Sequence, residues 1–243
     1  RNLELTETGR LVLSYADEIF SLGGELEDAV RNLPSTRPMV FKVGVADVVP
    51  KTIAYRLLAP ALSLADPVRI VCRESSLDSL LGELALHQLD LVIADNPIPP
   101  GLNVRGFNHS LGESGVSFLA APALTAKLGG EFPACLDGAP LLLPSAINSL
   151  QGRLLQWLEG LHIYPRVIGE FDDSALMKSF GQAGAGVFIA PTAIVEEVAQ
   201  QYAVQVVGAT GQVLEQFFAI SAERKISNPA VAAITETARA WLR

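Results

Sequence analysis

The first 33 residues carry one apolar stripe with the spacing of a helix. Its members recur every three or four positions, the period of an amphipathic helix, and they are Leu11, Tyr15, Ile19, Leu22, Leu26 and Val30. Thr6 is the expected N-cap, and Pro34 and Pro38 end the helix, so residues 34–39 are expected to be a hinge linker. A long helix with one narrow stripe predicts pairing with a second copy; packing on its own domain is the alternative.

From residue 40 the pattern changes to alternating strands and helices. Apolar runs predict strands at 40–46, 68–72, 89–94 and 114–120, with helices at 50–64 and 76–87. A second group has strands at 141–143, 166–171 and 187–190, with helices at 148–159 and 173–182. The chain then returns through strands at 204–207 and 215–221 to a helix at 229–241. The alternation predicts an α/β fold of two Rossmann-like lobes with parallel strands.

The predicted division of the chain follows from this order. Residues 1–33 are expected to contain the dimerisation helix, 40–122 with 203–243 the first lobe, and 123–202 the second lobe. The chain crosses twice between the lobes, and a cleft at such a junction is the default position for a ligand site.

Composition and charge narrow the function. The chain has 243 residues, 49% of them apolar and 18% charged, which is typical of a folded globular protein. No apolar run reaches bilayer length and no signal peptide is seen, so a cytoplasmic protein is expected; the Arg1 start suggests a fragment. The net charge of −8 speaks against direct binding of nucleic acid. Cys72 and Cys135 lack metal-site spacing and are expected to be buried, reduced thiols.

Three strings, in the right order, resemble LysR-type transcription regulators. They are LELTETG at 3–9, RESSLDSLLGELALHQLDLVIAD at 73–95 and GAGVFIAP at 184–191. The resemblance implies a wing end and linker helix followed by an effector-binding domain of the periplasmic-binding-protein type. It also implies self-association as a dimer or tetramer, operator DNA bound through an N-terminal domain missing here, and RNA polymerase as a further partner. In isolation, this piece is expected to sense an effector and to self-associate.

Four shorter strings resemble those family members that activate sodium/proton antiporter genes. They are VGVAD at 43–47, GESGVSF at 112–118, FPACL at 132–136 and GEFDD at 169–173. This narrower resemblance implies activation in response to sodium or alkaline stress. A monovalent cation or a small effector is then the expected ligand.

Candidate effector-binding residues lie where predicted strands end and helices begin. They are Asp47, Val48, Val49, Glu74, Ser75, Ser76, Asp95, Asn96, Glu113, Pro144, Ser145, Asn148, Phe171, Asp172 and Asp173. The many acids among them would repel an anion and attract a hard cation, which prefers oxygen ligands. Closely spaced carboxylates can also raise one another's pKa and act as a proton sensor. Helix capping is the plainer interpretation of Asp47, Ser76, Asp95 and Asp173, and His87, His109 and His162 are scattered and expected to be structural.

Two other classes of protein are alternatives to a regulator. An enzyme is not expected, because the chain lacks GxxxxGK[ST], a GxGxxG that follows a strand, GxSxG and metal-type His/Cys spacing; no cofactor is predicted. A periplasmic solute-binding protein would share the two lobes, but the long N-terminal helix favours the regulator. A LysR-type sensor of an ordinary metabolite, with the acids serving as caps, is the remaining alternative.

Overall fold

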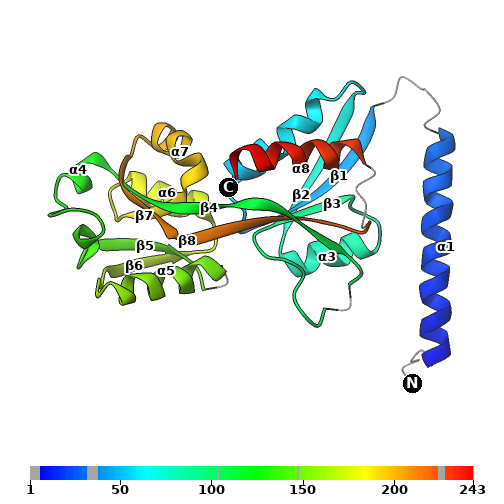
Figure 1. Ribbon diagram of the computed structural model, residues 1–243, viewed down its shortest axis with the longest axis horizontal. Helices are drawn as coiled ribbons and strands as arrows, with labels where there is room; N and C mark the ends of the chain where they lie inside the picture. The colour runs from blue at the N-terminus through cyan, green and yellow to red at the C-terminus, as the bar shows by residue number, and fades with distance from the viewer. Residues whose placement is uncertain (1–5, 32–37, 103, 147, 224–227, 243) are drawn as a thin grey trace. The chain divides into compact units, whose positions relative to one another are not determined.

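A computed structural model describes residues 6–31, 38–102, 104–146, 148–223 and 228–242, which form two compact units, residues 1–39 and 40–243 (Figure 1). The division falls between Met39 and Val40, where the sequence pattern changes from one helix to alternating elements. In the described residues no helix is both long and apolar enough to cross a bilayer.

The first unit contains the helix α1, Glu7–Arg31. The Thr6 hydroxyl accepts a hydrogen bond from the Gly9 amide at 3.1 Å, so the predicted cap is confirmed. Tyr15, Ile19 and Leu22 of the predicted stripe are exposed, whereas the side chains of Leu11, Leu26 and Val30 lie outside the described residues. A second exposed apolar row, Leu13 and Phe20, was not anticipated.

The first lobe of the second unit has the predicted strand–helix alternation. Its elements are β1 Met39–Ala46, α2 Lys51–Leu58, the 3₁₀ turn η1 Ala59–Ser63, β2 Val68–Ser75, α3 Leu77–Ala85 and β3 Leu91–Ala94. β1 and β3 pair in parallel, with Val43 opposite Leu91. The helix predicted at 50–64 is wrong at its end, because Pro60 lacks an amide hydrogen and the chain tightens there into η1.

The second lobe is built around the parallel pair β5 and β6. Its elements are α4 Pro122–Thr125, the 3₁₀ turn η2 Ala134–Leu136, β5 Pro140–Pro144, α5 Ser149–Gly160, β6 Arg166–Phe171, α6 Ser174–Gln182, β7 Phe188–Pro191, the 3₁₀ turn η3 Thr192–Ile194 and α7 Val195–Tyr202. Val187, just before β7, exchanges backbone hydrogen bonds of 2.8 Å with Pro140 and Leu142 of β5, which joins the pair to β7.

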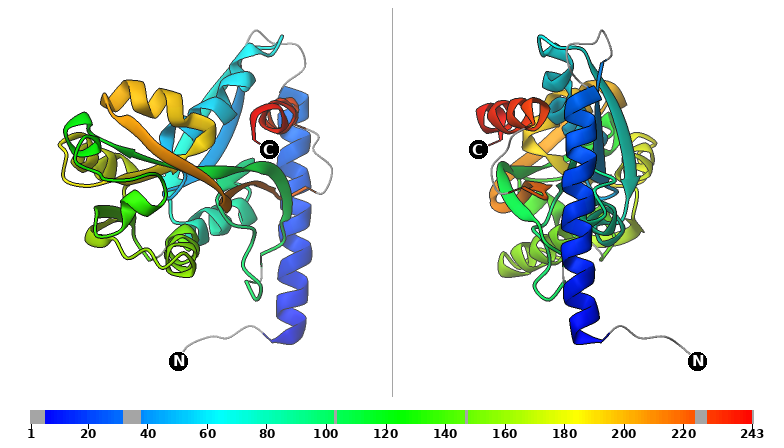
Figure 2. Two further views of the ribbon diagram at one scale, coloured as in Figure 1. Left: turned by 60° about the vertical axis from the view of Figure 1, so that its left-hand side comes forward. Right: turned by 90° about the vertical axis from the view of Figure 1, so that its right-hand side faces the viewer.

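Two long antiparallel strands, β4 Phe107–Ala120 and β8 Gln205–Ser221, run through both lobes (Figures 1 and 2). The larger sheet has the strand order β2-β1-β3-β8-β4-β7. The final helix is α8, Pro229–Trp241. The strand predicted at 114–120 is wrong at its start, because β4 begins at Phe107, and the two strands predicted at 204–207 and 215–221 are one strand, β8. Each of these two strands provides backbone hydrogen bonds to the other along its length. Glycines that interrupt the apolar pattern of a strand are therefore still held in the sheet.

The β4–β8 ladder is interrupted near its middle. Gly115 lies opposite Leu214, but the next residue, Val116, lies opposite Thr210. Residues 211–213 therefore bulge out of the ladder between the lobes, and we call this segment the pivot. The predicted lobe boundaries near 122 and 203 stay a prediction, since both strands serve both lobes.

The two cysteines differ in environment. Both are free thiols, but only Cys135, in η2, is buried. Cys72 lies on β2, at the edge of the six-stranded sheet, and is exposed, so the prediction of two buried thiols is wrong for this residue. An edge strand leaves its flank open to solvent, which an apolar run cannot reveal.

Candidate functional site

Three strand ends of the first lobe meet at one edge. The Asp47 amide, after β1, donates to the Ser75 carbonyl at the end of β2, at 3.1 Å. Lys51, in the first turn of α2, forms an ion pair with Glu74. Asp95 follows β3, and the charge of the Asp47 carboxylate acts on it. Parallel strands end at the same edge, so residues far apart in sequence are brought together here.

The second lobe presents a matching edge. The Ser145 amide, after β5, donates to the Phe171 carbonyl at the end of β6, at 2.8 Å. Asn148 caps α5 by accepting from the Leu150 amide at 2.9 Å. Asp173 caps α6 by accepting from the amides of Ala175 at 2.6 Å and Leu176 at 3.1 Å. These hydrogen bonds to the charged form lower the pKa of Asp173.

The two edges face each other. The Ser149 hydroxyl, at the start of α5, donates to the Asn96 side-chain oxygen at 3.4 Å. Arg153 of α5 acts electrostatically on Asp95, and Lys51 of α2 acts on Asp173 and Lys178 of α6. We call this place, between the ends of β1–β3 and the starts of α5 and α6, the interlobe site. Most of the residues proposed from sequence therefore lie around one site.

Other candidate effector-binding residues have different surroundings or roles in the structure. Val49 and Pro144 are buried framework residues, and Ser76 caps α3 by accepting from the Ser79 amide at 3.4 Å. The Glu113 carboxylate, on β4, accepts from the Gln216 side chain at 3.4 Å. The rings of Phe171 and Phe180 pack against each other, whereas Asp172 is exposed. Capping is thus the observed role of Ser76 and Asp173, while neither Asp47 nor Asp95 caps a helix in the structure.

Three charged side chains are buried at the interlobe site. Asp95, Lys178 and Glu215 are 6%, 5% and 4% exposed, which is rare for charged groups unless they are paired. Burial, followed by the charge of Asp95, raises the pKa of Glu215 to about 8. Burial also raises the pKa of Asp95. It lowers the pKa of Lys178, although the charges of Glu215 and Asp173 act to raise that pKa. The site is therefore built from mutually dependent charges.

The sequence interpretation missed the basic half of this site. Lys51, Arg153 and Lys178 bring three cations to a place that was expected to be acidic. The objection to an anionic effector is weakened accordingly. Within the described ranges, no group of three or more His, Cys, Asp or Glu side chains is arranged to hold a metal ion.

Sequence signals for two of the missed residues existed. Glu215 takes an inward position in the alternating run Val213, Glu215, Phe217, Ala219, all of which are buried. Lys178 lies next to Met177 and a turn from Gly181 on the buried side of α6. A charge at an apolar position of a periodic pattern marks a functional candidate. Arg153 and Lys51 carry no such signal, because both belong to exposed parts of their helices.

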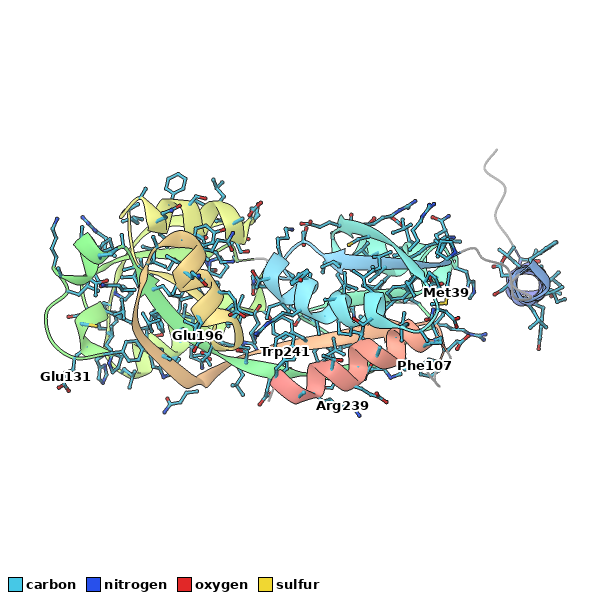
Figure 3. All side chains as sticks on the ribbon, turned by 90° about the horizontal axis from the view of Figure 1, so that it is seen from above. Met39, Phe107, Glu131, Glu196, Arg239 and Trp241 are labelled. Atoms are coloured by element: carbon cyan, nitrogen blue, oxygen red, sulfur yellow. The ribbon has the colours of Figure 1, made fainter. Side chains whose placement is uncertain are left out.

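A second contact between the lobes is made by Arg56 of α2. Its guanidinium donates to the Ala193 carbonyl of η3 at 2.7 Å and pairs with Glu197 of α7, also at 2.7 Å. The guanidinium carbon of Arg56 also lies over the ring of Trp241 in α8, 5.1 Å from the ring centroid (Trp241 is labelled in Figure 3). Arg56 thus holds η3, α7 and α8 against the first lobe.

Comparison with known proteins places this chain in a family. Residues 37–243 match the family described as the LysR substrate binding domain. The chain belongs to the LysR family of transcriptional regulators. It is 38% identical over 237 residues to the transcriptional activator protein NhaR of Escherichia coli (strain K12), an alignment that covers 98% of this chain and 77% of that relative. The NhaR protein of Shigella flexneri matches at the same identity and coverage.

Solved structures of LysR-type regulators share the fold. CbnR, a LysR family transcriptional regulator, gives a TM-score of 0.67 at 19% identity, covering 97% of this chain and 81% of CbnR. The effector binding domain of QuiR in complex with shikimate gives 0.61 at 14% identity, covering 85% of this chain and 98% of QuiR. The resemblance found in the sequence and the predicted α/β fold class are confirmed. The named relatives are transcriptional regulators and not enzymes.

Proposed function

We propose that this LysR-type chain senses an effector at the interlobe site and transmits occupancy as a change in the angle between its lobes. The observation that carries this proposal is the burial of Asp95, Lys178 and Glu215 at one place between the lobes. Buried charges are costly, and a packed apolar contact would hold two lobes at lower cost. An effector shifts the lobe equilibrium by its differential affinity for the two arrangements.

The signal we propose is sodium or alkaline stress, and the response is activation of sodium/proton antiporter genes. The similarity to NhaR, an activator by name, supports activation. A small organic metabolite is the second candidate, because Lys51, Arg153 and Lys178 supply the cations that a carboxylate would need. The chain acts without catalysis, in the cytoplasm.

A thermal-unfolding titration with sodium, lithium and potassium chlorides at matched ionic strength tests the nature of the signal. A ligand that binds only the native state stabilises it by about 2.7 kcal/mol at 100 times its Kd, whereas screening treats these salts nearly alike. We expect a larger rise in the midpoint with sodium or lithium. Identical curves would contradict a cation signal, and a panel of small carboxylates at fixed ionic strength would then test the metabolite.

The variant Arg153→Met tests whether the stabilising ligand binds at the interlobe site. The charge of Arg153 acts on Asp95 from α5, so its loss should change the stabilisation by the effective ligand at least several-fold. A carboxylate should lose stabilisation because it loses a cationic partner, whereas a cation should gain because it is no longer repelled. Arg166→Met is the matched control, because Arg166 is an exposed residue at the start of β6. Equal changes in both variants would place the binding site elsewhere.

We further propose that α1 pairs with α1 of a second copy, and that operator DNA is bound through an N-terminal domain. Tyr15, Ile19 and Leu22 are 59%, 67% and 67% exposed, and apolar area of this kind is stabilised by burial in a partner. Ile19→Asp with Leu22→Asp should lower the mass measured by light scattering. Asp17→Lys with Gly24→Lys, changes at exposed positions of the same helix outside the stripe, should leave it unchanged. A double aspartate variant of unaltered mass would rule out this pairing.

A further inference from the structure

Glu215 lies where a change of charge can move the lobes. It is opposite Ser114 in the β4–β8 ladder and two residues beyond the pivot, where the ladder is interrupted. Its side chain is buried at the interlobe site, against groups that come from both lobes. Its strand, β8, passes from one lobe into the other, so a force on this side chain acts on the connection itself.

Three charged side chains around β8 act on Glu215. Asp95 acts on it from the end of β3, Lys178 from α6 and Arg153 from α5. Behind these lie Asp47, Lys51 and Asp173, which act on Asp95 or Lys178 and not directly on Glu215. On β4, Glu113 is bonded to Gln216. On α7, Glu196 is exposed and Glu197 is paired with Arg56, while α4 carries no titratable side chain.

We propose that Glu215 is a proton switch of the interlobe site, uncharged at neutral pH and converted to a carboxylate in alkaline solution, where it binds the Lys178 ammonium and draws α6 toward β8. The step is a simple loss of a proton to solvent. The proposal rests on the proposed function, because it assigns regulation to the same site that takes the effector.

Two consequences follow for the site. The carboxylate adds a negative charge beside Asp95, so the site holds a cation more strongly, and an anion less strongly, in alkaline solution. The new attraction acts between β8 and α6, on either side of the pivot, so it changes the lobe angle and not only the local charge. Lys178 is already positioned for this by α6, whose start is fixed by the Asp173 cap.

The molecule carries its own reporter of the pivot. The Trp157 indole of α5 donates to the side-chain oxygen of Gln212, a pivot residue, at 2.8 Å. Emission from Trp157 therefore responds to movement of the pivot. A Trp241→Phe background removes the other indole and keeps an aromatic ring beside Arg56.

The test is a titration of the whole chain from pH about 6 to about 9.5 without effector, following glutamate carboxyl carbons by NMR and Trp157 emission. One carboxyl should titrate with a midpoint within about one unit of 8, and Trp157 emission should follow it. Glu215→Gln should abolish both transitions, Glu215→Asp should displace them, and Glu113→Gln should keep both.

Two results would overturn the switch. One is that no glutamate of the unmodified chain titrates above pH about 7, which is read without any variant. The other is that the Trp157 transition persists in Glu215→Gln. Because effector is absent, failure of the proposed effector function would leave these titrations unchanged and would show only in the salt and carboxylate series.

Discussion

The unmodified chain is expected to lose folding stability as the pH rises from about 5 to about 8, and Glu215→Gln is expected to remove most of that loss. The pKa of Glu215 is raised from an ordinary 4.5 to about 8, so the folded state holds a proton in this range that the unfolded chain has released. Stability therefore falls with increasing pH across this window. A shift of this size corresponds to on the order of 5 kcal/mol. Urea unfolding at one-unit steps of pH measures it.

The neighbouring carboxyl groups leave the sign of this prediction unchanged. The pKa of Asp95 is also raised, so its effect has the same direction. The pKa of Asp173 is lowered from its ordinary value of 3.8, so its carboxylate stabilises the fold at pH values above 3.8. That contribution is lost only as the pH falls below the range from about 5 to about 8. Lys178, whose pKa is lowered by burial, acts in the opposite direction wherever the folded chain has released a proton that the unfolded chain still holds. Glu113→Gln serves as the matched control and should retain the slope of the unmodified chain. A slope in Glu215→Gln equal to that of the control would refute the assignment.

Gly112→Ala is expected to destabilise the fold by about 3 kcal/mol or more. Gly112 has a φ of 137°, a conformation that other residues adopt at a cost, and a Cβ there would lie 2.6 Å from the Leu242 carbonyl oxygen. Backbone atoms cannot move aside as a flexible side chain can, so the end of α8 would be displaced from β4. Denaturant unfolding at pH 6 measures the loss.

Gly211→Ala is the matched control for Gly112→Ala. No atom lies within 4 Å of a Cβ built at Gly211, although it belongs to the same pair of strands. We expect a change within about 0.5 kcal/mol of zero. Equal losses at the two glycines would contradict the contact with Leu242 as the cause of the cost at Gly112.

The alternation of strands and helices could be predicted because each element has its own period. β1, β3 and α3 bury continuous or helical sets of apolar residues, which is a local signal. The lengths of β4 and β8 could not be predicted in the same way. Gly112, Gly208 and Gly211 weaken the strand pattern locally, and the hydrogen bonds that hold these segments come from a partner about a hundred residues away in the chain.

The sequence placed several candidate residues at neighbouring strand ends and helix starts, but it did not reveal the basic side chains around them. The ends of strands and the starts of helices point to Asp47, Asp95 and Asp173 from sequence alone, because turn and cap positions favour acids. Lys51 and Arg153 reach the site only because the lobes face each other, a long-range arrangement that no local pattern encodes. The character of the site, a balance of acids and bases, therefore emerges only in three dimensions.

The two strands that pass through both lobes make the connection a ribbon and not a pair of independent linkers. An antiparallel ribbon has a natural right-handed twist and deforms most readily by changing it. Rotation of one lobe relative to the other therefore changes the twist of β4 and β8, and the hydrogen bonds between these two strands resist that change. We expect this resistance to favour one of the two lobe arrangements whenever no effector is bound. A sensor with this connection reports the present state of its surroundings and keeps no memory of earlier ones.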